Sequence, residues 1–252
     1  MGVTRAPIAV ALDAPDLATM TRWASAVAPH VSTVKVGLEA YLRDGDDAVI
    51  AARAASAEAA GAACRIFLDL KLHDIPATVA GACRSVARLR PDFLTVHASG
   101  GAAMVAAAAR ELPDTRIVAV TVLTSLGVDD LVGMCLLREG ATSDDVRDLA
   151  IRLAVVSVDA GARAIVCSPE EVAGIRAALR EQMPDVADDI VLITPGVRPA
   201  GADLGDQVRV ATPAEALSRG ADLLVIGRPI TGSDDPAAAA AAIAAEIRDH
   251  GR

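Results

Sequence analysis

Eight short apolar segments recur along the chain, and stretches with helical periodicity separate them. Each segment is rich in Val, Ile or Leu and is bounded by polar residues, Gly or Pro, as buried parallel strands are. The intervening stretches, such as residues 16–28 and 144–161, carry acidic residues at their starts, as helices do. The apolar segments span residues 8–13, 32–37, 65–72, 93–98, 116–123, 162–168, 189–197 and 221–230.

This alternation predicts an α/β fold, and its eight repeats predict a closed (β/α)8 TIM barrel. A length of 252 residues fits such a barrel as a single domain, residues 1–252. An open doubly wound sheet is the alternative, although the first strand lacks the G-x-G-x-x-G turn that such folds often use. The long connection after the fifth strand predicts a short extra helix before the main one.

The formal net charge of −9 argues against non-specific binding to nucleic acid, which needs a basic face. The first residues lack a signal-peptide pattern, and no apolar run reaches the ~18 uncharged residues of a membrane-spanning helix. We therefore expect a cytoplasmic protein that binds neither nucleic acid nor membrane. The cysteines and histidines lack metal-ligand spacing, so the sequence predicts no metal site.

Charged residues recur at the C-terminal ends of the predicted strands. Asp13 ends the first strand, Lys35 lies in the second, and Asp69, Lys71 and Asp74 belong to the third. The active sites of such barrels lie at this end, so these residues are candidates for catalysis. Buried charges are costly unless they are paired, and structural ion pairs are therefore the alternative explanation.

The third strand reads RIFLDLKL, and its side chains alternate between two faces. Asp69 and Lys71 therefore share one face, which we expect to point into the barrel, while the leucines pack against helices. Asp74 lies beyond the strand, where capping the following helix is its alternative role. The next two strand ends offer His97, Thr124 and Ser125, whereas the sixth, followed by CSPEE, offers no candidate.

The last two strands run into loops that each contain Gly and Arg. Barrels often bind phosphate with the loops after strands seven and eight. Glycines let backbone N–H groups approach an anion, and Arg gives bidentate contacts. The sequence therefore predicts a phosphate site formed by Gly196, Arg198, Gly227 and Arg228.

The segment DLKLHDIP resembles the signature of the orotidine 5'-phosphate decarboxylase family in its bacterial form. The resemblance extends over the whole chain, through ALD, KVG, VHA, VLTS, TPGVRP and IGRPIT. It implies a cofactor-free enzyme that decarboxylates orotidine 5'-phosphate to uridine 5'-phosphate, the last step of de novo UMP synthesis. One departure is Ala77, where many bacterial relatives carry Asn, and we expect little consequence from it.

The resemblance also implies a role for each matching position. Lys71 would be the proton donor, and Asp69 would lie against the substrate carboxylate. Lys35 would bind ribose and hold the charged network, and Asp13 would hydrogen-bond the ribose hydroxyls. The other implied substrate contacts are Thr124 at the pyrimidine, Pro195 along the base, and Arg198, Gln207, Gly227 and Arg228 around the phosphate end.

The resemblance further implies a homodimer, because Asp74 and Thr78 would reach into the active site of a partner subunit. The chemistry suits these residue types. Loss of CO2 from orotate leaves a carbanion at C6, which the ammonium of Lys71 can stabilise before it donates a proton. Repulsion between Asp69 and the substrate carboxylate, ~4 kcal/mol at ~4 Å and an effective dielectric of ~20, is expected to matter less.

Two other functions remain as alternatives. Sister enzymes, a 3-hexulose-6-phosphate synthase or a 3-keto-gulonate-6-phosphate decarboxylase, share the D-x-K-x-x-D pattern but use Mg²⁺. They place an acid where this chain has Lys35, and a lysine there repels the ion. A non-catalytic sugar-phosphate-binding barrel is the second alternative, since fold does not imply function.

Overall fold

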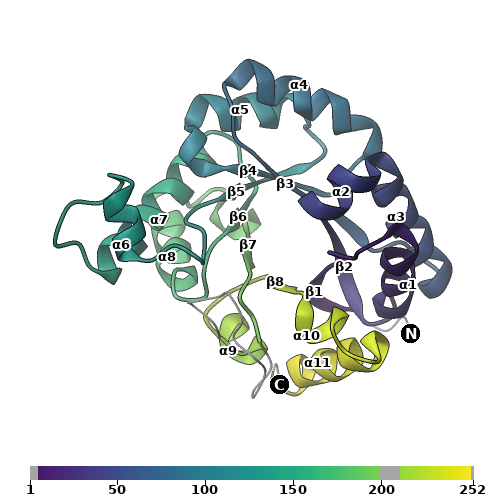
Figure 1. The fold of residues 1–252 in the computed structure, drawn as a ribbon. Coiled ribbons are helices and arrows are strands. Elements are labelled where there is room, and N and C mark those ends of the chain that lie inside the picture. Colours follow the sequence, from purple (N-terminus) through teal and green to yellow (C-terminus); the bar gives the residue numbers. More distant parts are fainter. Residues whose placement is uncertain (1–4, 199–210, 251–252) are drawn as a thin grey trace.

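In the computed structural model, which describes residues 5–198 and 211–250, the parallel strands β1 to β8 close into a barrel (Figure 1). Strands consecutive in sequence are paired, and β8 returns to pair with β1. The predicted closed barrel is confirmed, and the alternative of an open sheet is wrong. The strands are β1 Ala6–Ala11, β2 Val31–Gly37, β3 Arg65–Leu72, β4 Phe93–His97, β5 Arg116–Val120, β6 Ala164–Val166, β7 Val191–Thr194 and β8 Leu223–Ile226.

Helices surround the barrel (Figure 1). They are α1 Leu17–Val27, α2 Leu38–Asp44, α3 Asp46–Ala60, α4 Pro76–Val86, α5 Ala102–Glu111, α6 Val128–Gly133, α7 Ser143–Asp159, α8 Val172–Gln182, α9 Pro213–Ser218, α10 Arg228–Thr231 and α11 Pro236–His250, with 3-10 turns at Ala87–Leu89, Ala98–Gly100 and Ala187–Asp189. The extra helix predicted after the fifth strand is α6. Within the described ranges, no helix combines the length and apolar character needed to cross a bilayer.

Two apolar layers hold the barrel together. The larger lies between strands and helices and includes Leu68, with Leu70 and Leu72 packed against it, as the alternation in β3 predicted. The smaller fills the barrel interior, where the rings of Phe67 and Phe93 lie 5.6 Å apart. These are the chain's two phenylalanines, and both rings therefore lie inside the barrel, below the C-terminal ends of the strands.

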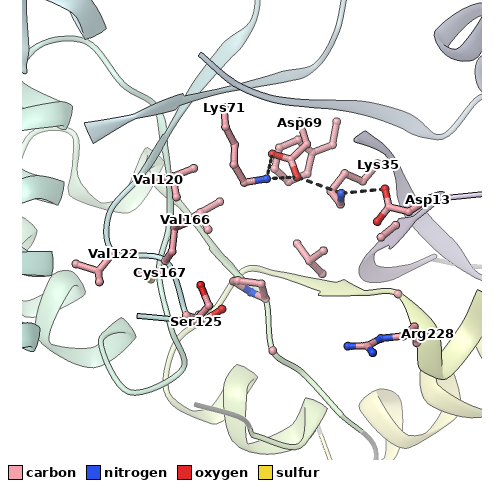
Figure 2. A pocket seen from close by; sticks show the side chains of 18 of the residues that line it. Asp13, Lys35, Asp69, Lys71, Val120, Val122, Ser125, Val166, Cys167 and Arg228 are labelled. Carbon is pink, nitrogen blue, oxygen red and sulfur yellow. Dashed lines mark hydrogen bonds and ion pairs between the residues drawn. The ribbon is translucent and has the colours of Figure 1, made fainter. Parts of the chain in front are cut away.

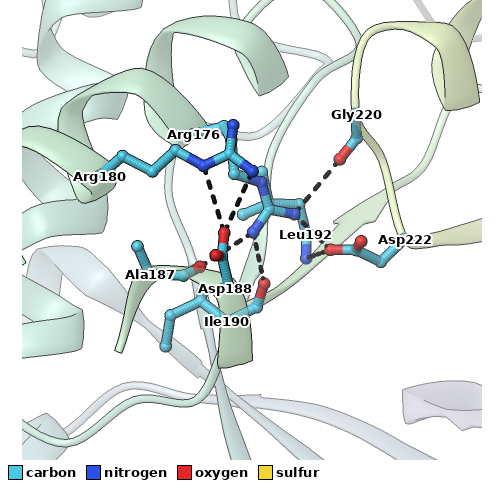
Figure 3. A network of polar contacts seen from close by, with 8 residues as sticks. All are labelled: Arg176, Arg180, Ala187, Asp188, Ile190, Leu192, Gly220 and Asp222. Atoms are coloured by element: carbon cyan, nitrogen blue, oxygen red, sulfur yellow. Dashed lines mark hydrogen bonds and ion pairs between the residues drawn. The ribbon is translucent and has the colours of Figure 1, made fainter. Parts of the chain in front are cut away.

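A polar network joins the N-terminal ends of β7 and β8 (Figure 3). The guanidinium of Arg176, on α8, donates to the carbonyls of Ala187 (3.1 Å) and Ile190 (2.9 Å) and forms an ion pair with Asp222 (2.5 Å). The same Asp222 carboxylate accepts the backbone N–H of Leu192 at 2.7 Å. This network fixes the starts of the two strands whose other ends carry the two Gly/Arg loops.

Candidate active site

A cavity of about 590 Å³ opens at the C-terminal ends of the strands (Figure 2). Its volume lies within the range of small-molecule sites. The residues predicted from the sequence that line it are Asp13, Lys35, Asp69, Lys71, Thr124, Pro195, Arg198, Gly227 and Arg228. Ser125 and Gly196, from the same loops, also line it. The cavity therefore brings together predicted residues that are up to 215 positions apart, Asp13 and Arg228 being the extremes of this predicted set.

Four charges of alternating sign form a row along this cavity (Figure 2). Lys71 Nζ donates to both oxygens of Asp69, at 2.8 and 2.9 Å. Lys35 Nζ lies 3.1 Å from the Asp69 carboxylate and 3.7 Å from that of Asp13. The shared face predicted for Asp69 and Lys71 is therefore confirmed, and each buried charge of the row has an opposite neighbour.

Burial and charge act against each other in this row. Burial alone would raise the pKa of Asp69, but Lys35 and Lys71 outweigh it and lower the pKa to about 2. Burial would likewise lower the pKa of Lys35, and the carboxylates of Asp69 and Asp13 raise it above its ordinary value. The site therefore holds a carboxylate and an ammonium in their charged forms inside the protein.

The backbone that carries Lys71 departs from a regular strand. The register between β3 and β4 shifts between the pairs Leu68–Leu94 and Leu72–Val96, so β3 has two more residues than β4 there. Lys71 lies in this bulge with a φ of 48°, in the left-handed region that non-glycine residues rarely adopt. The bulge turns its side chain, one-third exposed, into the cavity.

An apolar wall, which the sequence analysis missed, completes the cavity. Val120 and Val122 from the end of β5, and Val166 and Cys167 from the end of β6, line it. The sixth strand end was expected to offer nothing. Val166 lies at the end of β6, two residues after Ala164 and therefore on the same face of the strand. These two features could have identified it, since Ala164 and Val166 both pack in the barrel interior.

The Gly/Arg loops lie on the cavity side formed by β7 and β8. Gly196 has a φ of 75°, which glycine adopts without strain. The backbone N–H of Arg198 donates to the carbonyl of Ala211 (3.0 Å). Arg228 begins α10 directly after Gly227, and Figure 2 shows its guanidinium apart from the charged row. Gln207 lies outside the described residues.

Two of the predicted residues do not line the cavity of their own chain. Asp74 and Thr78 are exposed beyond β3, next to Ile75, which is 66% exposed. The N-cap of α4 is Ile75, not Asp74, so the capping role considered for Asp74 is wrong. Instead, one Asp74 oxygen accepts the adjacent N–H of Ile75 at 2.6 Å.

His97, offered by the fourth strand end, also lies outside the cavity lining. Its ring packs against that of His73, with centroids 5.3 Å apart. Burial lowers the pKa of His97, and His73 and Lys71 lower it further. Within residues 5–198 and 211–250, no three His, Cys, Asp or Glu side chains are grouped so as to hold a metal ion.

Comparison with known proteins gives consistent matches over nearly the whole chain. The family model described as "Orotidine 5'-phosphate decarboxylase / HUMPS family" matches residues 6–243. An orotidine 5'-phosphate decarboxylase of Thermobifida fusca is 63% identical over 98% of this chain and 97% of its own length. One of Frankia casuarinae is 54% identical over 98% and 90%. The crystal structure of the Lactobacillus acidophilus enzyme of the same name matches with a TM-score of 0.75, at 32% identity, over 96% of this chain and 99% of that one.

Proposed function

The chain belongs to the orotidine 5'-phosphate decarboxylase / HUMPS family and decarboxylates orotidine 5'-phosphate, and we propose that it does so without a metal or cofactor. The observation that carries this mechanism is the position of Lys71. Its ammonium lies in the cavity, held by both oxygens of Asp69 at 2.8 and 2.9 Å. It is thus a fixed positive charge with a proton to give, beside an apolar wall.

In the proposed reaction, the bond between C6 of the pyrimidine and its carboxylate breaks, and CO2 leaves. The electron pair stays on C6 as a carbanion, which the Lys71 ammonium stabilises. The carbanion then takes a proton from Lys71 Nζ, and the resulting neutral amine regains one from solvent. Val120, Val166 and the other apolar residues of the wall exclude water, which strengthens this electrostatic stabilisation.

Asp69 has two tasks in this proposal. It balances the charge of Lys35 and Lys71 in the free enzyme, and it lies against the substrate carboxylate in the complex. Its pKa of about 2 supports an ionised carboxylate at neutral pH, which would repel a second carboxylate nearby. Lys35 and Lys71 offset part of this repulsion, so we assign the larger share of catalysis to stabilisation of the carbanion.

Lys35 argues for this reaction over the magnesium-dependent one. The Lys35 ammonium lies 3.1 Å from one oxygen of Asp69, and the Lys71 ammonium lies within 2.9 Å of both oxygens. A Mg²⁺ ion prefers oxygen ligands and would meet two ammonium groups here. The same arrangement, with all its charges retained, disfavours a non-catalytic sugar-phosphate-binding barrel.

We assign the substrate phosphate to the loops after β7 and β8. Arg198 and Arg228 provide the positive charge, and Gly196 and Gly227 allow close approach of the backbone. Gln207 would contribute from the same connection. The ribose would lie between this phosphate site and the charged row, within reach of Asp13 and Lys35, with Thr124 and Pro195 along the base.

We also propose a homodimer in which Asp74 and Thr78 complete the partner's site. Both are exposed in the single chain, outside the lining of its own cavity. Leu38 (44% exposed) and Leu42 (78%) on α2, together with Ile75 (66%) at the start of α4, form an apolar surface near the ends of β2 and β3 that suits a subunit contact. A single catalytic domain over residues 1–252 and a cytoplasmic location remain predictions.

Purified protein tests the proposal directly. Addition to orotidine 5'-phosphate should decrease the pyrimidine absorbance and release CO2. Lys71→Ala should abolish this change while retaining the fold. A wild-type protein that is folded but leaves the absorbance unchanged would refute the assignment.

A further inference from the structure

The hydroxyl of Thr95 contacts two neighbouring residues of the charged row, Lys71 and Asp69, from the side away from the cavity. Thr95 lies in the middle of β4 and is fully buried, and it does not line the cavity. Its Oγ1 lies 2.8 Å from the backbone nitrogen of Lys71 and 3.0 Å from Oδ1 of Asp69. One buried side chain therefore contacts both the backbone of Lys71 and the carboxylate that holds its ammonium.

The direction of both hydrogen bonds follows from their chemistry. A backbone N–H only donates, so Thr95 Oγ1 accepts from Lys71. An ionised carboxylate only accepts, so the Thr95 hydroxyl donates its single proton to Asp69. Valine, which matches threonine in shape, offers neither function. It would leave a buried N–H without its partner and a buried carboxylate with one donor fewer.

The bulge in β3 explains why a side chain is needed here. Two extra residues of β3 interrupt its regular ladder with β4 between Leu68 and Leu72, and Lys71 lies in this interval. The N–H of Lys71 donates to Thr95 Oγ1, while Lys71 adopts its φ of 48°. The hydrogen bond thus anchors the backbone in the conformation that directs the ammonium toward the cavity.

We propose that Thr95 is a positioning residue for the decarboxylation, acting through Lys71 and Asp69 without touching the substrate. The inference rests on the proposed function, because it assigns the geometry of the proton donor to a residue of β4. Since Thr95 lies behind the row and away from the phosphate loops, its loss should affect turnover more than substrate binding.

Thr95→Val tests this, with Thr95→Ser as the conservative variant and Thr33→Val as the matched control. Thr33 is a fully buried threonine on β2, and its hydroxyl contacts Ser32 (3.2 Å), not the charged row. Loss of one hydrogen bond to a charged group predicts a decrease in kcat of about 10- to 100-fold for Thr95→Val, with KM changed by less than about threefold. Thr95→Ser retains the hydroxyl and should stay within about threefold of the wild-type kcat.

A second readout does not depend on activity. Hydrogen exchange at the Lys71 amide, measured by NMR, should become at least about tenfold faster in Thr95→Val and remain unchanged in Thr33→Val. Should Thr95→Val fail to fold, Thr95→Cys provides the comparison, because a thiol is only a weak donor and acceptor.

Wild-type kcat in Thr95→Val or Thr95→Cys, or equal losses in Thr95→Ser and Thr95→Val, would overturn the inference. So would a Lys71 amide that exchanges at the same rate in wild type and variant. An inactive wild-type enzyme would instead refute the proposed function, and amide exchange would still decide whether Thr95 anchors Lys71.

Discussion

Gly37 lies so close to Asp13 that a methyl group on its Cα would stand 2.6 Å from the Asp13 Oδ1 atom. The same methyl group would lie 3.0 Å from Lys35 Nζ. The φ of Gly37 is −91°, which any residue adopts, so the requirement for glycine comes from this close approach alone. Both atoms end flexible side chains, and a larger residue would therefore displace the ion pair and leave the backbone in place.

Gly37→Ala should separate activity from stability. We expect kcat/KM to fall by at least about tenfold, as one charge-assisted contact to the ribose is disturbed, while the melting temperature stays near that of the wild type. Gly133→Ala is the matched control, since an added methyl group there meets no atom within 4 Å. Steady-state kinetics and thermal unfolding check both statements. Unaltered kinetics in Gly37→Ala would mean that the Asp13–Lys35 pair has no part in the reaction.

Activity should survive removal of divalent metal ions. The Lys35 and Lys71 ammonium groups occupy both sides of the Asp69 carboxylate, so we expect the same kcat in excess chelator as in buffer. The absorbance assay with and without EDTA measures this. Activity that disappears with EDTA and returns with Mg²⁺ would favour the magnesium-dependent sister enzymes.

Arg228→Ala should weaken substrate binding and also slow turnover. Binding energy from the phosphate, remote from C6, helps to position the base. We therefore expect a large loss of kcat/KM with orotidine 5'-phosphate and little change in the slow reaction of orotidine, which lacks the phosphate. Arg219→Ala, an exposed arginine outside the cavity lining, should leave both reactions unchanged. Equal losses for the two substrates in Arg228→Ala would identify Arg228 as a structural residue.

Mixed dimers should reveal whether Asp74 serves the partner's site. Asp74→Ala and Lys71→Ala homodimers should each be nearly inactive. After subunit exchange, one site of each mixed dimer carries both substitutions and the other carries neither. With half of the dimers mixed and half of their sites intact, activity should recover to about a quarter of wild type. Mass spectrometry verifies the exchange, and no recovery after verified exchange would place Asp74 in its own subunit's site.

The free energy of unfolding should decrease on acidification, as Asp69 becomes protonated. Its pKa is about 2 in the folded protein, below the ordinary aspartate value of 3.8, so the unfolded state takes up the proton first on acidification. This contribution is present above pH 3.8 and is lost as pH falls toward 2. By linkage it amounts to about 2 kcal/mol of unfolding free energy. Asp69→Asn should therefore show a flatter stability curve than wild type over this interval, measured by denaturant unfolding. Parallel curves would contradict the assigned shift.

The sequence was sufficient for the barrel because its strands are continuous apolar segments with polar ends, a pattern that local composition determines. Their spacing also predicted that Asp69 and Lys71 share one face, although in the structure a bulge takes part in directing Lys71 into the cavity. Asp13, Thr124 and Arg228 could be assigned to the cavity because each lies at or after the end of a strand, and all parallel strands of the barrel end at the same rim.

Other parts of the site depend on relations between strands, which no single segment contains. The bulge in β3 arises from its pairing with β4, and the contacts of Thr95 exist only because of that bulge. His97 has the same parity as Thr95 and ends β4, yet it packs against His73 and not into the cavity. Asp74 was a plausible helix cap by position, but the following Ile75–Pro76 pair begins the helix one residue later.

The left-handed backbone at Lys71 has a further consequence, for directed evolution. A non-glycine residue in this region costs of order 1–3 kcal/mol, so the fold alone would favour glycine at position 71. Among inactive variants, Lys71→Gly should therefore be more stable than Lys71→Ala. A library selected only for thermal stability would therefore retain Lys71→Gly more readily than Lys71→Ala, although both abolish turnover, so it needs selection for activity in every round.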